Sequence, residues 1–419
     1  MNLLESFHHP EKYWKALLKW GLLGALMGGI GGLLGAFFHH ALHFVTHVRG
    51  EHPWLVWLLP LAGLASVGIY RLFRLRNNRG TNEIIDAILN GDSVNPLIAP
   101  VIFLATAATH LFGGSAGREG AALQLGGSVA SWLGKALRLK ENERTVLIMS
   151  GMAAVFAGLF GTPLTATIFT MEFASVGTIF SPALLPCYMA AFMASRVSAA
   201  MGVHAEVFYL EEPLAFTFTV NWQVLVLTAA VGMLGIFLCW FWHKAEHLAA
   251  EKIPNPWLRI AVGGAVIAVL TLLVGDQRYN GAGMNMALGA VGGQADWYDF
   301  LMKLLFTAVT LSAGFKGGEI VPTFCIGATF GCVLGGLLGL DPGIAAAMGL
   351  VGLFCGVTNS PIASIFLSIE MFGSANVYLF AFVCVITFVI SGNWGLYASQ
   401  RIRFSRSRLV KREYHPEHH

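Results

Sequence analysis

Charged residues are scarce in this sequence, at 12% of its 419 residues. An average soluble domain has about a quarter of its residues charged, which covers its surface with polar groups. Hydrophobic residues make up 56% of the chain, and 49 residues are glycine, whose small size lets helices approach closely in lipid. The scarcity of charge excludes a cytosolic enzyme, a nucleic-acid-binding protein and a disordered chain. It predicts a multi-pass protein of the lipid bilayer.

Cysteine motifs are also missing. The six cysteines all lie in apolar stretches without a C-x-x-C spacing, so we interpret them as buried small hydrophobic residues rather than disulfides or metal ligands. No nucleotide motif is present, and we expect no cofactor and no metal. The first residues contain acid, proline and histidine before a long apolar run, which argues against a cleavable signal peptide.

The apolar runs are interrupted by glycine and proline. They recur from residue 14 to about residue 396, and several are shorter than the roughly 20 residues that a membrane span needs. The interruptions include GGSAGREG, FGTP, FKGGEIVP and TNSP. Broken backbone at membrane depth is tolerated only where it is buried in protein or lines a watery cavity. The pattern therefore predicts an all-α membrane protein with broken, tilted helices around a solute pathway.

Positive charges cluster in three places, residues 71–79, residues 135–144 and the tail 401–419. The segment 203–221 contains acids but neither lysine nor arginine. Because short cytoplasmic loops are enriched in lysine and arginine, we predict that both termini lie in the cytoplasm and that 203–221 lies outside. We expect 401–419 to be a short basic tail in place of a soluble regulatory domain.

An internal repeat organises the chain. Residues 157–173 (AGLFGTPLTATIFTMEF) resemble 355–371 (CGVTNSPIASIFLSIEM), which pairs Glu172 with Glu370. Two further matches follow the same order about 200 residues apart: 117–127 with 317–327, and 79–84 with 280–285. We predict two homologous membrane repeats, 1–210 and 211–400. If the first repeat has an odd number of membrane spans, the second repeat has the inverted topology, and the functional sites gather between the two repeats.

The stretch GGSAGREG (113–120) has the chemistry of an anion site, because a glycine-rich turn that opens a helix presents free backbone N–H groups. Glu119 brings a negative charge to the same place. This makes sense for a movable carboxylate that competes with the anion and takes up a proton when displaced. The alternative is an ion pair between Glu119 and Arg118 at the membrane edge.

GREG in this context, together with the two-fold repeat, resembles the CLC family of anion channels and proton-coupled antiporters. The family's motif GSGIP falls here at Gly80-Thr81-Asn82-Glu83-Ile84, GREGP becomes GREGA, and GxFxP falls at Gly318-Glu319-Ile320-Val321-Pro322. The resemblance implies a homodimer, a gate at Glu119 and an anion filter. The filter residues it implies are Gly80, Thr81, Asn82, Gly117, Arg118, Gly120, Gly318, Ile320, Val321 and Tyr397.

Two departures are similar to the fluoride-exporting clade of this family, namely the loss of the GSGIP serine and the glutamate in the third motif. Fluoride is a strong hydrogen-bond acceptor, and a protonated Glu319 can donate to it where phenylalanine cannot. For chloride, a second carboxylate would chiefly add repulsion and desolvation cost. We therefore predict a fluoride/proton antiporter with Glu119 and Glu319 as its gating and proton-transfer residues. The alternative function is a chloride channel or a chloride/proton antiporter. The alternative role of Glu319 is a structural ion pair with Lys316.

The inner proton route differs from the family pattern. Chloride-transporting antiporters of the family carry a proton-transfer glutamate immediately after the position of Glu172, where this chain has Phe173. A fluoride exporter could move protons through Glu119 and Glu319 instead, and a channel could lack the route.

Three other features of the sequence can each be interpreted in more than one way. His39, His43 and His47 share one helix face, where interfacial or subunit packing is preferred to metal binding, and His110 is interpreted as a satisfied core residue. Residues 113–117 also fit the hydrolase elbow G-x-S-x-G, with Ser115 as nucleophile. That elbow follows a strand, which this helical context does not predict, and a hydrolase does not explain the repeat. We expect a transporter rather than an enzyme, and no nucleic-acid partner.

Overall fold

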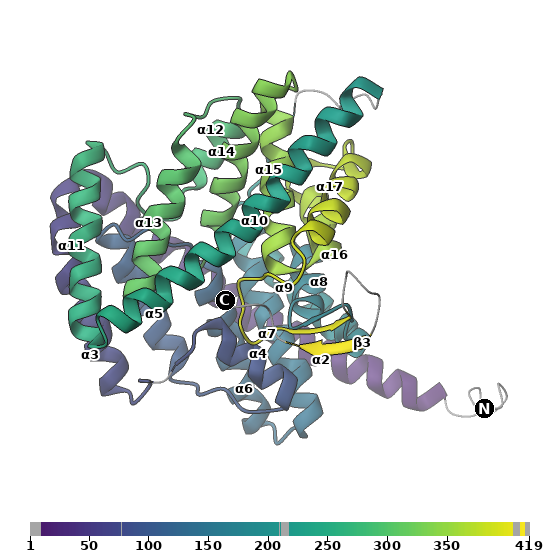
Figure 1. The fold of residues 1–419 in the computed structure, drawn as a ribbon. Coiled ribbons are helices and arrows are strands. Elements are labelled where there is room, and N and C mark those ends of the chain that lie inside the picture. The colour runs from purple at the N-terminus through teal and green to yellow at the C-terminus, as the bar shows by residue number, and fades with distance from the viewer. Residues whose placement is uncertain (1–9, 77, 209, 211–217, 405–410, 415–419) are drawn as a thin grey trace.

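The computed structural model describes residues 10–76, 78–208, 210, 218–404 and 411–414. Helices make up most of the described backbone (Figure 1). In the first half these are α2 (Pro10–Glu51), η1 (Pro53–Leu58), α3 (Leu59–Leu72), α4 (Thr81–Asn90), α5 (Ile98–Leu111), α6 (Glu119–Ala136), α7 (Glu141–Phe160), α8 (Pro163–Glu172), η2 (Ser181–Ala183) and α9 (Leu184–Ala200). In the second half they are α10 (Phe218–Lys252), α11 (Pro256–Val274), α12 (Met284–Val291), α13 (Asp299–Ala313), α14 (Ile320–Leu338), α15 (Pro342–Thr358), α16 (Pro361–Phe372) and α17 (Val377–Ile390).

Membrane-crossing length varies among these helices. Within the described ranges, seven helical segments are long and apolar enough to cross a membrane, whereas α5, α15, α16 and α17 are apolar but shorter. The breaks fall where glycine and proline predicted them, since α8 and α16 both begin at a proline and α6 begins inside GREG. The predicted all-helical fold with broken helices is confirmed.

The helix contacts of the first half recur in the second half between the helices whose numbers are eight higher. The pairs α2–α7, α2–α9, α5–α6, α6–α7 and α7–α9 of the first half recur as α10–α15, α10–α17, α13–α14, α14–α15 and α15–α17. The two halves also contact each other directly, through α3 with α11 and α8 with α16. Figure 1 shows α3 and α11 side by side at one edge of the molecule. This packing is what an internal repeat produces. The boundaries 1–210 and 211–400 remain predictions, and residue 211 lies outside the described residues.

Glycine lets the central helices approach each other. A Cβ atom at Gly126 on α6 would overlap the carbonyl oxygen of Gly151 on α7, and one at Gly327 on α14 would overlap that of Gly349 on α15. Both pairs lie in equivalent helix pairs of the two halves. The abundance of glycine therefore follows from backbone-to-backbone contact between helices. All six cysteines are free and buried, as predicted.

A small sheet joins the C-terminal tail to the first half. β1 (Ser175–Val176) pairs parallel to β2 (Arg401–Phe404), which pairs antiparallel to β3 (Lys411–Tyr414). The side chain of Gln400 donates hydrogen bonds to the carbonyl oxygens of Phe173 (2.6 Å) and Thr358 (2.8 Å). We expected only a basic tail over 401–419. A strand of two residues is too short to show an alternating pattern, so the sequence did not predict this pairing.

Candidate functional site

Two glycine-rich turns, one from each half, meet at the centre of the molecule. Gly117 and Gly318 form an antiparallel bridge in which each N–H donates to the other carbonyl oxygen, at 2.7 and 2.8 Å. The turns precede α6 and α14, so the bridge brings the first turns of these helices together. Gly120 packs against Gly317 and Thr81, and Ile320 is fully buried. The predicted Gly117, Gly120, Gly318 and Ile320 thus lie together in one backbone framework.

The Glu119 carboxylate lies inside this framework and is fully buried. Its Oε1 accepts a hydrogen bond from the Arg118 N–H (3.1 Å), and its Oε2 accepts one from the Val321 N–H (3.2 Å). The carboxylate therefore occupies backbone N–H groups at the starts of two helices, which is the kind of site that binds an anion. Arg118 touches it only through the backbone.

The Arg118 guanidinium points away from Glu119. It forms an ion pair with Glu206, lies 3.1 Å from His39 Nδ1 and stacks 5.1 Å from the centre of the Phe160 ring. The alternative pairing of Glu119 with the Arg118 side chain is therefore absent. Glu206 was not singled out from the sequence, because its partner lies 88 residues away in the chain.

Two cavities approach Glu119. The first, which we call the histidine vestibule, has a volume of about 610 Å³, and its wall includes His39, His43, His47, Arg49, His110 and Arg118. The second, the basic vestibule, has a volume of about 630 Å³, and its wall includes Arg71, Arg76, Arg79, Arg259, Lys316 and Glu319. They share no lining residue. Val321, which donates to Glu119, lines the histidine vestibule, whereas Gly317 and Glu319 line the basic vestibule. Neighbours of Glu119 thus line both cavities, although Glu119 itself lines neither.

Four of the predicted filter residues lie at the basic vestibule, whereas Arg118 and Val321 line the histidine vestibule. Gly80, Thr81, Asn82 and Tyr397 all line the basic vestibule. Gly80 has a φ of 63° just before α4, and the Asn82 side chain accepts a hydrogen bond from the Ser399 N–H at 2.9 Å, which ties the α4 start to the Tyr397 segment. The Tyr397 side chain is 2% exposed, and its hydroxyl has no hydrogen-bond partner among the described residues.

Glu319 lies at the start of α14 with its side chain in the basic vestibule. It forms no ion pair with Lys316 within the described part of the chain. The Lys316 ammonium instead lies 4.8 Å from the centre of the Tyr70 ring. Glu246, on α10, also lines this cavity, and its charge acts on both Lys316 and Glu319. Sequence reasoning missed Glu246, because nothing in the α10 pattern shows which face meets the cavity.

Phe173 and Glu172 occupy different environments. Phe173 is fully buried, and its ring meets the Tyr397 ring edge-on, with the centres 5.9 Å apart. Glu172 accepts hydrogen bonds from the N–H groups of Ile362 (3.2 Å) and Ala363 (2.9 Å) at the start of α16. Glu172 is therefore a helix cap. The next position, where chloride-transporting antiporters of the family carry the proton-transfer glutamate, holds Phe173 and no acid.

The structure places all four histidines singled out from the sequence on one cavity wall. His39, His43 and His47 line the histidine vestibule, and their interfacial or packing role stays a prediction. His110 is not fully satisfied, because its Nε2 is buried without a hydrogen-bond partner in the described part of the chain. The i, i+4, i+8 spacing predicted the shared face correctly but could not show what that face meets.

Ser115 does not have the surroundings of a hydrolase nucleophile. It follows a helix and turn, and its Oγ lies 3.0 Å from Thr307 Oγ1 and 3.0 Å from Lys303 Nζ. Lys303 Nζ also donates to the carbonyl oxygens of Tyr279 (3.0 Å) and Gly281 (2.7 Å). With all three of its hydrogens donated in this way, the Lys303 ammonium has no lone pair that could accept the serine proton. Ser115 thus positions Lys303 and the loop before α12.

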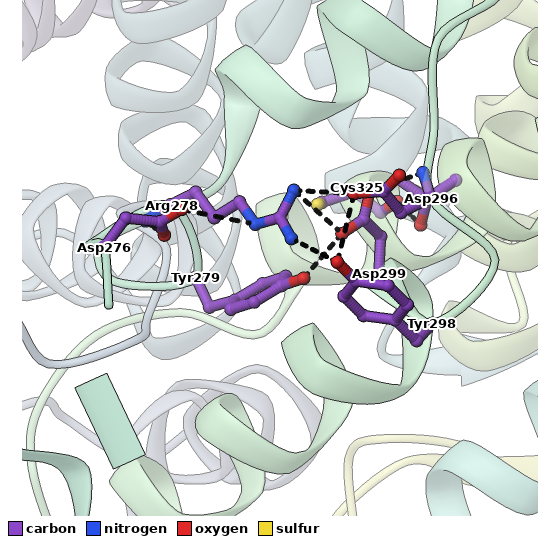
Figure 2. A network of polar contacts seen from close by, with 8 residues as sticks. Asp276, Arg278, Tyr279, Asp296, Tyr298, Asp299 and Cys325 are labelled. Atoms are coloured by element: carbon purple, nitrogen blue, oxygen red, sulfur yellow. Dashed lines mark hydrogen bonds and ion pairs between the residues drawn. The ribbon is translucent and has the colours of Figure 1, made fainter. Parts of the chain in front are cut away.

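A polar network holds the same loop at the rim of the histidine vestibule (Figure 2). Arg278 pairs with Asp296 at 2.8 Å and lies 3.7 Å from both Asp276 and Asp299. The Tyr279 hydroxyl donates to Asp299 at 2.6 Å. The network fixes the loop against the start of α13, and its acids neutralise Arg278.

Comparison with known proteins shows the family of the chain. The family described as voltage gated chloride channel matches residues 62–392. A chloride/fluoride channel protein from Pseudomonas syringae is 36% identical over 416 residues, which cover 96% of this chain and 91% of that protein. An H(+)/Cl(−) exchange transporter from Vibrio vulnificus is 26% identical and covers 85% of this chain and 82% of that protein.

Two solved structures have the same fold. The crystal structure of a CLC-type fluoride/proton antiporter matches with a TM-score of 0.88 and 35% identity, over 92% of this chain and 98% of that one. A slow cyanobacterial Cl−/H+ antiporter matches with a TM-score of 0.77 and 20% identity, over 89% of this chain and 94% of that one.

Proposed function

Since this chain belongs to the voltage-gated chloride channel (CLC) family, we propose that it is a membrane fluoride/proton antiporter that exports fluoride in exchange for protons. The observation that carries the proposal is the position of the Glu119 carboxylate, which fills a backbone N–H cradle between two cavities. An anion that crosses between the cavities needs the same N–H groups. Anion passage and displacement of Glu119 are therefore linked.

Displacement links the anion to a proton. Once an anion holds the N–H groups of Arg118 and Val321, the Glu119 carboxylate loses both hydrogen bonds. A buried carboxylate without partners is strongly disfavoured, and protonation relieves that penalty. Movement of the protonated side chain toward either vestibule then carries the proton, and the returning carboxylate expels the anion.

The groups that face the anion on the basic side favour fluoride. Glu319 in its protonated form and the unpartnered Tyr397 hydroxyl are both O–H donors. Fluoride accepts strong hydrogen bonds, and such donors compensate for its lost hydration.

The proton route from Glu119 to the basic side runs through Glu319 in this proposal. Phe173 supplies no acid, whereas Glu319 lies in the cavity wall and Glu246 faces it from α10. Glu246 is exposed, so it can exchange protons with bulk water. The relay therefore needs three carboxylates: Glu119 at the gate, Glu319 beside it and Glu246 at the cavity mouth.

Charge distribution supports an orientation in the cell membrane. The basic vestibule carries Arg71, Arg76 and Arg79 and is placed on the cytoplasmic side with both termini, by the positive-inside rule. The histidine vestibule with Glu206 then faces outside. We further propose a homodimer with one pathway in each subunit, which chemical cross-linking in vesicles tests.

Flux from reconstituted liposomes tests the function. We expect a fluoride gradient to drive proton movement in the opposite direction, recorded with a fluoride electrode and a pH dye. Fluoride flux without opposed proton movement would make the protein a channel. Chloride flux equal to or faster than fluoride flux would replace the proposal with a chloride transporter of the same family.

A further inference from the structure

The wall of the histidine vestibule contains a buried guanidinium without a carboxylate partner. Arg49, in the last turn of α2, is 7% exposed, and its Nη1 donates to the His110 carbonyl oxygen at 2.7 Å. Arg118 and Arg278 on the same wall are paired with acids, but no ion pair involves Arg49 in the described part of the chain. A buried charge is normally paired, so the positive charge of Arg49 calls for an anion.

His110, on the same cavity wall, has a second unused polar group. The residue is 4% exposed. Its Nδ1 lies 2.9 Å from the Thr106 carbonyl oxygen, which can only accept, so Nδ1 carries a hydrogen. Nε2 has no partner. A neutral His110 therefore presents a lone pair at Nε2, and a protonated His110 presents a donor.

The charges around His110 are positive. Arg49 from α2, Arg118 from the turn before α6 and Lys303 from α13 all act on its ring. The other ionisable groups of the wall are His39, His43 and His47 on α2, Glu206, and Arg278, which its acids neutralise. Glu206 is held by Arg118. Protonation of His110 is unfavourable among these cations unless an anion enters, and the anion in turn binds better when Nε2 carries a proton. Linkage makes this coupling reciprocal.

We propose that Arg49 and His110 form a second anion site, on the histidine-vestibule side of Glu119, that binds a small monovalent anion together with one proton on His110. The proton comes from water in the vestibule and no covalent bond to the anion forms. The identity of the anion as fluoride rests on the proposed function, whereas the site itself rests on the contacts above. In the transport direction proposed, the site receives fluoride after it passes Glu119 and collects the proton that the gate requires.

Fluoride binding to purified protein, measured by calorimetry at several pH values from about 4.5 to about 7.5, tests the site, because this range runs from well below to above the usual pKa of histidine. The measurement uses the Glu119→Gln background, so that the gate does not contribute to the pH dependence. We expect fluoride affinity to rise toward acidic pH, by at most about tenfold per pH unit for one linked proton.

Added substitutions separate the contributions. His110→Gln places a permanent N–H donor near the Nε2 position, so fluoride should still bind but lose the pH dependence that His110 supplies. Arg49→Gln should weaken binding about tenfold or more, as expected for loss of a charge-assisted hydrogen bond. Arg49→Lys should restore it in part, and Arg196→Gln, at an exposed position that lines neither cavity, is the control that should change nothing.

The proposal fails if His110→Gln leaves the pH dependence unchanged, or if Arg49→Gln and Arg196→Gln bind fluoride equally well. A variant that does not elute as a single peak in size-exclusion chromatography is replaced by its conservative partner, Arg49→Lys or His110→Asn. Titration with chloride separates the two proposals. Chloride binding with the same dependence on His110 would support the site and overturn fluoride as its anion.

Discussion

Glu172 and Glu370 each cap the start of the helix that carries the other acid, across the two halves of the molecule. Glu172, at the end of α8, accepts from the first N–H groups of α16, and Glu370, on α16, accepts from the N–H groups of Leu164 (2.9 Å) and Thr165 (2.8 Å) at the start of α8. The exchange is reciprocal, as a two-fold axis between the repeats requires. It also gives both acids a structural task, because a carboxylate at a helix N-terminus is stabilising.

Replacing either cap should lower stability and leave coupling intact. Glu172→Gln and Glu370→Gln each remove a charged acceptor from a helix start, and we expect a loss of about 1–2 kcal/mol in the free energy of unfolding. Thermal stability by fluorescence-detected chromatography measures this loss. Proton coupling measured in liposomes should match that of the unchanged protein. Loss of coupling in Glu172→Gln alone would return this acid to the proton route.

Glu119→Gln should abolish proton coupling while fluoride still moves. The amide cannot take up a proton, and it competes less well than a carboxylate for the backbone N–H groups of the cradle. Simultaneous recording of fluoride and pH in liposomes shows the separation. Glu251→Gln, at an exposed position on α10, serves as the control and should behave as the original protein. Unchanged coupling in Glu119→Gln would remove this residue from the mechanism.

Two substitutions of Glu319 should differ in a diagnostic way. Gln can still donate a hydrogen bond, so Glu319→Gln should keep fluoride transport and weaken proton coupling. Leu can neither donate nor carry a proton, so Glu319→Leu should reduce fluoride transport about tenfold or more, given the strength of hydrogen bonds to charged groups. Initial fluoride efflux rates compare the two. Equal rates for both variants would contradict a donor role.

The Tyr397 hydroxyl is well suited to a clean test, because no protein hydrogen bond is lost with it among the described residues. Tyr397→Phe should slow fluoride transport about tenfold without a change in thermal stability. Tyr70→Phe is the matched control, since the Tyr70 hydroxyl is also buried without a partner and its side chain lines the same cavity. An equal effect of both substitutions would point to packing rather than to anion binding.

Backbone contact between α6 and α7 predicts a large effect of a small change. Gly126→Ala places a Cβ against the Gly151 carbonyl and should cost about 1–3 kcal/mol through overpacking. Gly21→Ala on α2 is the control, because a Cβ there meets nothing within 4 Å and alanine favours the helix by about 0.5–1 kcal/mol. Melting temperatures should therefore move in opposite directions. A fall in both would indicate that glycine is needed for another reason.

The amino-acid sequence by itself determined the membrane setting, the breaks in the helices and the place of Glu119. These depend on composition, on glycine and proline at particular positions, and on short motifs, all of which are local. The repeat was also visible, because similar segments recur in the same order. The gathering of Asn82 and Tyr397 at one cavity followed from the resemblance to a family rather than from spacing.

Only the tertiary structure decided which charges meet. Arg118 with Glu206, Arg49 with His110, and Lys303 with Ser115 join residues that lie 61 to 188 positions apart in the chain. The orphan Nε2 of His110, the place of Glu246 in the cavity wall and the strand at 401–404 depend on the same long-range packing. A sequence pattern shows which face of a helix is polar, but the partner of that face is set by how distant segments pack together.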